Sequence, residues 1–140
     1  MGAKPHILIV DDDRVLDKIL GTALDRAGFQ VSVAYDGHQG LDKVQEARPD
    51  LIFADVMMPR MDGYEFCHHL KADARLASIP IIMFTALGDL SLLKQSCEDP
   101  TLKVDEFITK PVRIGDLLER VRALLWLDQV PASNVSAREG

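Results

Sequence analysis

Short apolar runs alternate with segments of helical periodicity along most of this chain, and this alternation most limits the fold it can adopt. We expect five strands, at residues 6–10, 30–35, 51–55, 79–85 and 106–109. Apolar residues recur at helical spacing between and after these runs, at residues 15–27, 41–47, 64–70 and 114–125. The apolar but poorly periodic stretch at 87–97 is also expected to be a helix. Strands that alternate with helices form a parallel sheet covered by helices on both faces. The sequence therefore predicts an α/β domain.

The bulk properties of the chain agree with one globular domain. A length of 140 residues, 47% of them hydrophobic, suffices for one buried core. We expect this domain at residues 1–128, followed by a disordered tail or linker at 129–140. The formal charge of −6 disfavours direct binding to nucleic acid. Since no apolar run is long enough to cross a bilayer and no signal peptide precedes the first strand, we expect a cytoplasmic protein, without a membrane contact, whose cysteines are free thiols.

Polar side chains with reactive groups stand where the predicted strands end. Asp11 and Asp12 come directly after the first strand, and Asp55 ends the third. Thr85 ends the fourth strand, and Lys110 follows the fifth. Any one of them alone is explained by a turn or a helix cap. The carboxyl ends of parallel strands, however, meet at one edge of the sheet, where such folds bind ligands. Together, the five residues predict a functional site.

The three carboxylates of the predicted site, Asp11, Asp12 and Asp55, limit its chemistry. They repel one another unless one holds a proton or a cation joins them. Ligands that are all oxygen atoms, with no clustered histidine or cysteine, favour a hard ion such as Mg²⁺. Mg²⁺ beside a lysine and a hydroxyl group suits phosphoryl transfer, in which a carboxylate can act as the nucleophile.

Four motifs carry a resemblance to a known family. They are Val10-Asp11-Asp12, the segment 55–63 (DVMMPRMDG), Thr85-Ala86 and Lys110-Pro111. In this order and at this spacing they resemble the receiver domain of two-component response regulators, over about residues 6–127. The resemblance implies a flavodoxin-like (βα)5 fold, with a five-stranded parallel sheet of strand order 2-1-3-4-5 and helices on both faces. That order would place Asp11 and Asp12 beside Asp55.

The resemblance also implies a role for each residue of the site. Asp55 would accept a phosphoryl group from the phosphohistidine of a histidine kinase or a histidine phosphotransfer protein. Asp12 and Asp55 would bind Mg²⁺ directly, together with the backbone carbonyl of Met57. Asp11 would act on the ion mainly through water. Lys110 would pair with a phosphoryl oxygen.

A second set of residues would respond to phosphorylation. Thr85 would donate its hydroxyl to a phosphoryl oxygen and move toward Asp55, and Phe107 would turn inward with that motion. The change would reach the face formed by the fourth helix, the fifth strand and the last helix, which could contact a second copy or an output domain. The family also has a cis peptide bond before the proline that corresponds to Pro111, so we expect a cis Lys110–Pro111 bond.

These implications describe a signalling domain rather than a turnover enzyme, and alternatives remain. One is an interaction module that is never phosphorylated (a pseudo-receiver). Another is a Mg²⁺-dependent phosphohydrolase with Asp55 as catalytic intermediate, which is disfavoured because Met57 replaces the second aspartate of the Asp-x-Asp pattern usual in such enzymes. A flavodoxin-like cofactor binder is weaker still, because Asp11 and Asp12 would repel a phosphate unless a cation intervened.

Two features depart from the family pattern. Residues 97–105 lack the Gly-Ala pair common before the fifth strand and form a longer segment, which predicts an altered fourth helix or a longer loop after it. Met57 and Leu87 occupy positions that flank the path of the hydrolytic water in this family. Because both are apolar, we expect slow self-dephosphorylation.

The extra acidic residue Asp13 is predicted to cap the first helix or to be solvated.

Overall fold

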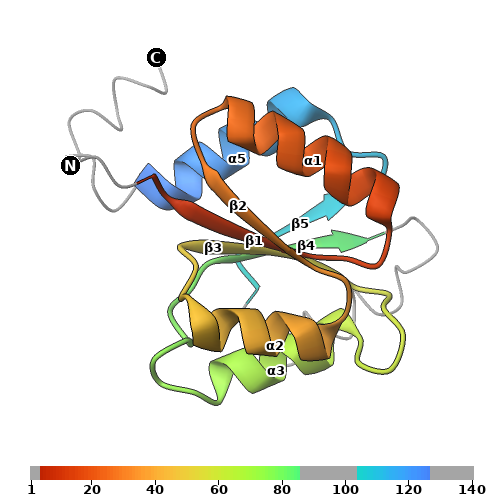
Figure 1. Ribbon diagram of the computed structural model, residues 1–140, viewed down its shortest axis with the longest axis vertical. Coiled ribbons are helices and arrows are strands. Elements are labelled where there is room, and N and C mark those ends of the chain that lie inside the picture. The colour runs from red at the N-terminus through yellow and green to blue at the C-terminus, as the bar shows by residue number, and fades with distance from the viewer. Residues whose placement is uncertain (1–3, 86–103, 127–140) are drawn as a thin grey trace.

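A computed structural model describes residues 4–85 and 104–126 of the chain. These residues form one sheet and the helices that cover it (Figure 1). None of the described helices is long and apolar enough to cross a membrane. Along the chain the elements are β1 (His6–Val10), α1 (Arg14–Arg26), β2 (Gln30–Ala34), α2 (Gly37–Glu46), β3 (Leu51–Asp55), α3 (Gly63–Lys71), β4 (Ile81–Thr85), β5 (Glu106–Thr109) and α5 (Ile114–Trp126).

The strands are all parallel and lie in the order β2-β1-β3-β4-β5. This order confirms the predicted fold. The chain leaves β1 for β2 on one side and later returns to β3 on the other, which makes the gap between β1 and β3 the switch point at which such folds bind ligands. Val10 pairs with Ala54, and Asp55 pairs with Phe84. The carboxyl ends of β1, β3 and β4 therefore lie along one edge.

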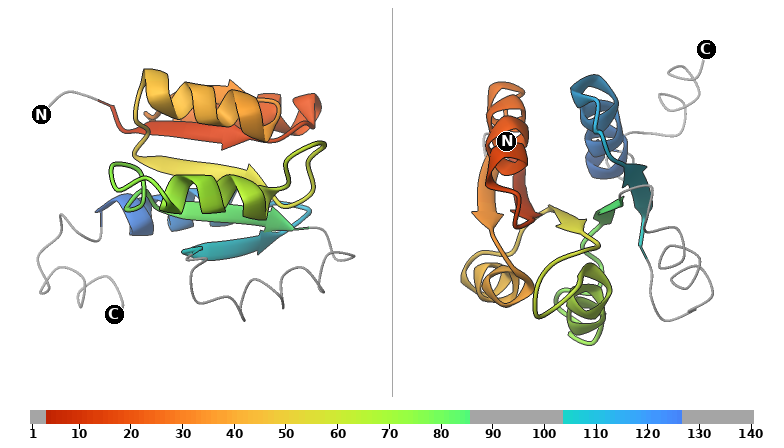
Figure 2. Two further views of the ribbon diagram at one scale, coloured as in Figure 1. Left: turned by 90° about the horizontal axis from the view of Figure 1, so that it is seen from below. Right: turned by 90° about the vertical axis from the view of Figure 1, so that its right-hand side faces the viewer.

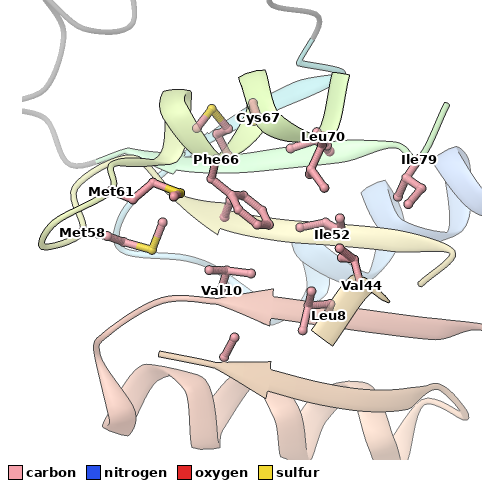
Figure 3. Packing of buried hydrophobic residues seen from close by; sticks show 14 of the residues in the cluster. Leu8, Val10, Val44, Ile52, Met58, Met61, Phe66, Cys67, Leu70 and Ile79 are labelled. Carbon is pink, nitrogen blue, oxygen red and sulfur yellow. The ribbon is translucent and has the colours of Figure 1, made fainter. Parts of the chain in front are cut away.

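Helices cover both faces of the sheet, with α1 and α5 on one side and α2 and α3 on the other (Figure 2). Because successive side chains of a strand point to opposite faces, β1 supplies Ile7 and Ile9 to the core beneath α1 and α5. Its alternate residues, Leu8 and Val10, belong to the other core, where Phe66 of α3 points toward the sheet (Figure 3). Burial on both faces explains why the central strands are continuous apolar runs.

Aspartates begin the three helices that follow β1, β2 and β3. Asp13 caps α1, where its carboxylate accepts hydrogen bonds from the N–H groups of Val15 and Leu16, both at 3.1 Å. This confirms the capping interpretation of Asp13. Asp36 and Asp62 cap α2 and α3 in the same manner. Each cap satisfies amide groups that the first helical turn leaves unpaired, and so determines where a loop ends at this edge of the sheet.

Two elements begin elsewhere than their apolar patterns predict. α2 starts at Gly37, well before its first apolar side chain, because the cap at Asp36 organises a polar first turn. β4 starts at Ile81 instead of residue 79. The N–H of Ile79 is bonded within the preceding turn, and Pro80 has no N–H with which to pair.

Four predicted features lie wholly or mostly outside the described residues. They are the helix at 87–97, the position of Leu87, the altered segment at 97–105 and the tail at 129–140. These features stay predictions.

Cys67, one of the two expected free thiols, is buried and forms no disulfide.

Candidate functional site

The three predicted aspartates meet at the carboxyl edge of the sheet. Because Val10 pairs with Ala54, the residues that follow them, Asp11 and Asp55, stand side by side. One carboxylate oxygen from each of Asp11, Asp12 and Asp55 lies within 4.8 Å of the others. Asp11 and Asp55 are buried, whereas Asp12 is exposed. The cluster therefore opens to solvent at Asp12.

Asp11 is the most enclosed member of the cluster. Its Oδ1 accepts a hydrogen bond from the Asp13 N–H at 3.0 Å, but no described residue makes a hydrogen bond with its Oδ2. Burial, and then the charge of Asp55, raises the pKa of Asp11 to about 7 against the opposing effect of the Asp13 N–H. Near neutral pH this carboxyl group can therefore hold either a proton or a cation.

Lys110 places a positive charge against these carboxylates. Its Nζ lies 3.2 Å from Asp55 Oδ2 and 3.6 Å from Asp11 Oδ2. Its backbone N–H donates to the Thr85 carbonyl at 2.9 Å, which ties it to the end of β4. Burial alone would lower the pKa of the Lys110 ammonium, but Asp11 and Asp55 outweigh burial and raise it. The Lys110–Pro111 peptide bond is cis, the isomer that the family resemblance implies.

The loop after Asp55 is packed closely against the end of β3. The Met57 N–H donates to Asp55 Oδ1 at 3.2 Å, and the Gly63 N–H donates to the Val56 carbonyl at 2.9 Å. A Cβ atom at Gly63 would lie 2.4 Å from the Asp55 carbonyl oxygen, so glycine is required where α3 begins. The side chain of Met57 is 53% exposed and lies at the rim of the site.

Thr85 and Phe107 lie on neighbouring strands beside the cluster. Thr85 ends β4, is buried and pairs with Thr109, while Phe107 of β5 pairs with Met83. Because alternate residues of a strand share a face, Thr85 and Phe107 face the same side of the sheet. Phe107 is only partly buried against the core on that side.

Comparison with known proteins establishes the family of the chain. Residues 7–122 match the family described as the response regulator receiver domain. The chain belongs to this family. The receiver domain is a signalling domain and not an enzyme in the ordinary sense. Asp11, Asp12, Asp55, Thr85 and Lys110 lie at the carboxyl edge of its sheet, where the family resemblance predicts the site.

Curated relatives of this receiver domain are longer proteins. It is 39% identical over 128 residues to the DNA-binding dual master transcriptional regulator RpaA of Synechocystis sp., across 91% of this chain and 52% of that protein. It is 38% identical over 120 residues to the response regulator MprA of Mycobacterium avium, across 86% of this chain and 50% of that protein. The chain thus spans about half the length of the curated relatives that it matches.

Solved receiver domains have the same fold. The signal receiver domain of a histidine kinase from Syntrophus aciditrophicus is 37% identical, with a TM-score of 0.79, over 86% of this chain and 89% of that chain. The Vibrio cholerae chemotaxis protein CheY4 is 29% identical, with a TM-score of 0.80, over 88% and 100% of the two chains. The receiver domain of sensor histidine kinase PA1611 from Pseudomonas aeruginosa is 25% identical, with a TM-score of 0.77, over 88% and 98%, and carries a magnesium ion in its active site cleft.

The acidic cluster of this receiver domain is suited to the same ion. Its ligand atoms are carboxylate oxygens from Asp11, Asp12 and Asp55, which are hard donors of the kind that Mg²⁺ prefers. The Asp11 Oδ2 is buried and lacks a hydrogen bond from any described residue, so a cation or its water would satisfy it. The residues present therefore fit Mg²⁺.

Sequence reasoning missed one acidic residue near the site, Asp17. It lies on the core-facing side of α1 together with Leu20 and Leu24 and is buried. The signal that could have found it is spacing, because residues three and seven positions apart share one face of a helix.

Proposed function

We propose that this receiver domain is a phosphorylation-controlled switch whose phosphoacceptor is Asp55. The observation that carries the proposal is the environment of the Asp55 carboxylate. It is buried, faces the Lys110 ammonium at 3.2 Å and has an oxygen within 4.8 Å of oxygens of Asp11 and Asp12. The phosphoryl donor is a phosphohistidine carried by a histidine kinase or a histidine phosphotransfer protein.

The transfer needs positioning and charge neutralisation more than acid–base chemistry. An oxygen of Asp55 forms a bond to phosphorus as the bond between phosphorus and the histidine nitrogen breaks, and the electron pair of that bond stays on the imidazole. Lys110, already in contact with Asp55, pairs with one phosphoryl oxygen. The Thr85 hydroxyl donates a hydrogen bond to another.

A Mg²⁺ ion belongs to this proposal. Asp12 and Asp55 would hold it directly with the backbone carbonyl of Met57, and Asp11 would act mainly through water. When bound, the ion neutralises charge on the carboxylates and on the transferred phosphoryl group. The fit of the carboxylate cluster and the magnesium ion of the PA1611 receiver domain support this assignment.

The surface around the site suits a docking protein. Three large apolar side chains are exposed among the described residues, namely Val15 (72%), Ile19 (52%) and Met57 (53%). Val15 and Ile19 lie in α1, which follows β1, and Met57 follows β3, so all three stand after strand ends that form the site. Large apolar groups exposed near the site favour an interaction with another protein, here the phosphohistidine donor.

Phosphorylation is read through Thr85 and Phe107. Thr85 moves toward the phosphorylated Asp55, and Phe107 turns into the space that this movement opens. The change passes to β5, α5 and the predicted helix at 87–97, where an output domain or a second copy binds. In this proposal the domain spans residues 1–128, is cytoplasmic and makes no contact of its own with nucleic acid or membrane. Met57 and Leu87 make loss of the phosphoryl group slow.

The test is phosphorylation by a small donor such as acetyl phosphate, followed by intact-protein mass spectrometry. We expect the mass of one phosphoryl group to be added with Mg²⁺ present, and not with a chelator or in Asp55→Asn. Asp36→Asn is the matched control, because Asp36 is another buried aspartate after a strand and asparagine also caps helices. It should be labelled like the wild type.

Two other outcomes would favour the rival functions. A wild-type protein that binds Mg²⁺ but is never labelled would be a pseudo-receiver. Continuous release of phosphate, far in excess of the protein, would instead indicate a phosphohydrolase.

A further inference from the structure

Asp17 is a buried carboxyl group that the proposed phosphoryl transfer does not use. Its exposure is only 3%. Neither side-chain oxygen makes a hydrogen bond with any residue in the described part of the chain. An unpaired carboxylate in such a place is unstable, because burial penalises the charged form and no donor compensates for it.

The position of Asp17 is set by α1. Asp17 lies one turn after the cap Asp13, whose carbonyl accepts its backbone N–H at 2.9 Å. On the same face, Leu20 and Leu24 are buried in the core beneath α1. The carboxyl group is thus held by the packing of the helix near the carboxyl edge of the sheet, and not by polar contacts.

The charged groups that act on Asp17 lie in the candidate site or directly beside it. They are Asp11 at the end of β1, Asp12 and Asp13 in the loop before α1, and Lys110 in the loop after β5. Burial is the largest influence on the pKa of Asp17, followed by repulsion from Asp11 and Asp13. Lys110 opposes them, and the pKa is raised to about 8.

The charge of the acidic cluster is incompletely balanced. Asp11, Asp12 and Asp55 together carry three negative charges when ionised, and Lys110 supplies one positive charge. A divalent cation would balance the other two. Because Asp17 is repelled by this cluster, neutralising the cluster removes part of the force that keeps a proton on Asp17.

We propose that Asp17 is a proton store linked to the acidic cluster. Its carboxyl group keeps a proton while the cluster is without a cation and releases that proton to solvent when a divalent cation binds. The O–H bond of the carboxyl group breaks and the electron pair stays on the oxygen. By thermodynamic reciprocity, ionisation of Asp17 strengthens cation binding by the same factor. The inference rests on the proposed cation site, but Asp17 is not a ligand of the ion.

The first test follows Asp17 itself in the whole 140-residue protein. The side-chain carboxyl carbons of ¹³C-labelled aspartates are titrated by NMR with and without saturating MgCl₂, and Asp17→Asn assigns the Asp17 signal. Without Mg²⁺ we expect its midpoint near pH 8. With Mg²⁺ the midpoint should fall by about one unit. A midpoint that Mg²⁺ leaves in place would overturn the proposal, as would a carboxylate that is ionised throughout the neutral range.

The second test counts protons by calorimetry in buffers of different ionisation enthalpy, at a pH near 7.5. Wild type should release more protons per Mg²⁺ bound than Asp17→Asn. Asp25→Asn is the matched control, because Asp25 lies exposed on the same helix, and it should behave as wild type. Equal proton release from wild type and Asp17→Asn would refute the linkage while leaving the cation site intact. A protein that binds no Mg²⁺ at all would refute the proposed cation site as well, and the binding isotherm separates these two results.

Discussion

The molecule buries aspartates in two regions at the carboxyl edge of the sheet, and their surroundings differ. Asp36, after β2, is 8% exposed and accepts hydrogen bonds from the Gln39 N–H at 2.8 Å and from Arg60 at 3.0 Å. These partners, the Gln39 N–H foremost, hold the pKa of Asp36 below its usual range. Asp11, after β1, is fully buried beside Asp55. Its Oδ2 accepts no hydrogen bond from a described residue, although Lys110 Nζ lies 3.6 Å away, and its pKa is raised to about 7.

The comparison separates a structural aspartate from the aspartates of the candidate site. Asp36 is balanced by its neighbours and begins a helix. Asp11, Asp12 and Asp55 are brought together with fewer positive charges than negative ones, an arrangement that destabilises the fold unless a ligand completes it. An aspartate after a strand is therefore common to both regions. The candidate site is distinguished by negative charges that the neighbouring positive charges do not fully balance.

The largest difference between the two regions is expected when the positively charged side chain of each is removed in turn, Lys110 at the candidate site and Arg60 beside Asp36. Lys110→Met should slow phosphorylation of Asp55 by about 10²-fold, because a positioned positive charge at the transferring group is lost. Arg60→Met should leave the rate near that of wild type, since Arg60 pairs with Asp36 alone among the described acidic residues. Rates are measured by mass spectrometry with a small phosphodonor.

Equal slowing of phosphorylation by Lys110→Met and Arg60→Met would contradict the distinction between the two regions. So would a Lys110→Met protein that is phosphorylated at the wild-type rate. Circular dichroism of both variants separates a loss of chemistry from a loss of fold.

Stability should respond to the two aspartates with opposite sign. Asp11→Asn, measured without Mg²⁺, should raise the free energy of unfolding by about 1–3 kcal/mol, because it removes a buried charge from a repulsive cluster. Asp36→Ala should lower it by about 1 kcal/mol through loss of the cap of α2. Urea denaturation of the two variants and wild type gives both values, and the same sign for both would contradict the account.

A comparable effect is expected in the pH dependence of stability without Mg²⁺. The folded-state pKa values of Asp11 and Asp17 are raised to about 7 and about 8, above their ordinary value of 3.8. Their stabilising contribution is thus full below that ordinary value and is lost as pH rises through about 7 and 8. Across the interval from mildly acidic to mildly alkaline pH, each should account for about 1–3 kcal/mol of this loss, since one pKa unit corresponds to about 1.4 kcal/mol. Asp36, with a lowered pKa, loses its contribution only as pH falls below its ordinary range.

Urea denaturation at several pH values checks this prediction. Asp17→Asn should flatten the fall in stability between mildly acidic and mildly alkaline pH, and Asp36→Ala should not. A wild-type protein that becomes more stable over that interval in the absence of Mg²⁺ would be incompatible with raised pKa values at Asp11 and Asp17.

Much of the fold could be predicted because the strands are buried on both faces. A run such as Leu51–Asp55 is apolar throughout and ends in a polar residue, so both its type and its end are visible in the sequence. The start of α2 at Gly37 was not visible. It depends on a hydrogen bond from the Gln39 N–H to Asp36, and not on an apolar pattern.

The residues of the site were also predictable, but their electrostatics were not. Strand ends placed Asp11, Asp12 and Asp55 at one edge of the sheet, and the strand order that the family resemblance implies placed them side by side. Which carboxyl group keeps a proton depends on burial and on distances of a few ångströms, as at Asp11 and Asp17, and these come only from packing. Spacing puts Asp17 on the same face of α1 as Leu20 and Leu24, but its burial and its lack of a hydrogen-bond partner among the described residues come only from the structure.

The central claim is that Asp55 itself becomes an aspartyl phosphate. Borohydride reduction of the phosphorylated protein converts an aspartyl phosphate to homoserine, which peptide mass spectrometry can locate. The account predicts homoserine at position 55, formed only when Mg²⁺ and a phosphodonor are both supplied. Homoserine at position 11 or 12 instead, or none in a protein shown to carry a phosphoryl group, would contradict it.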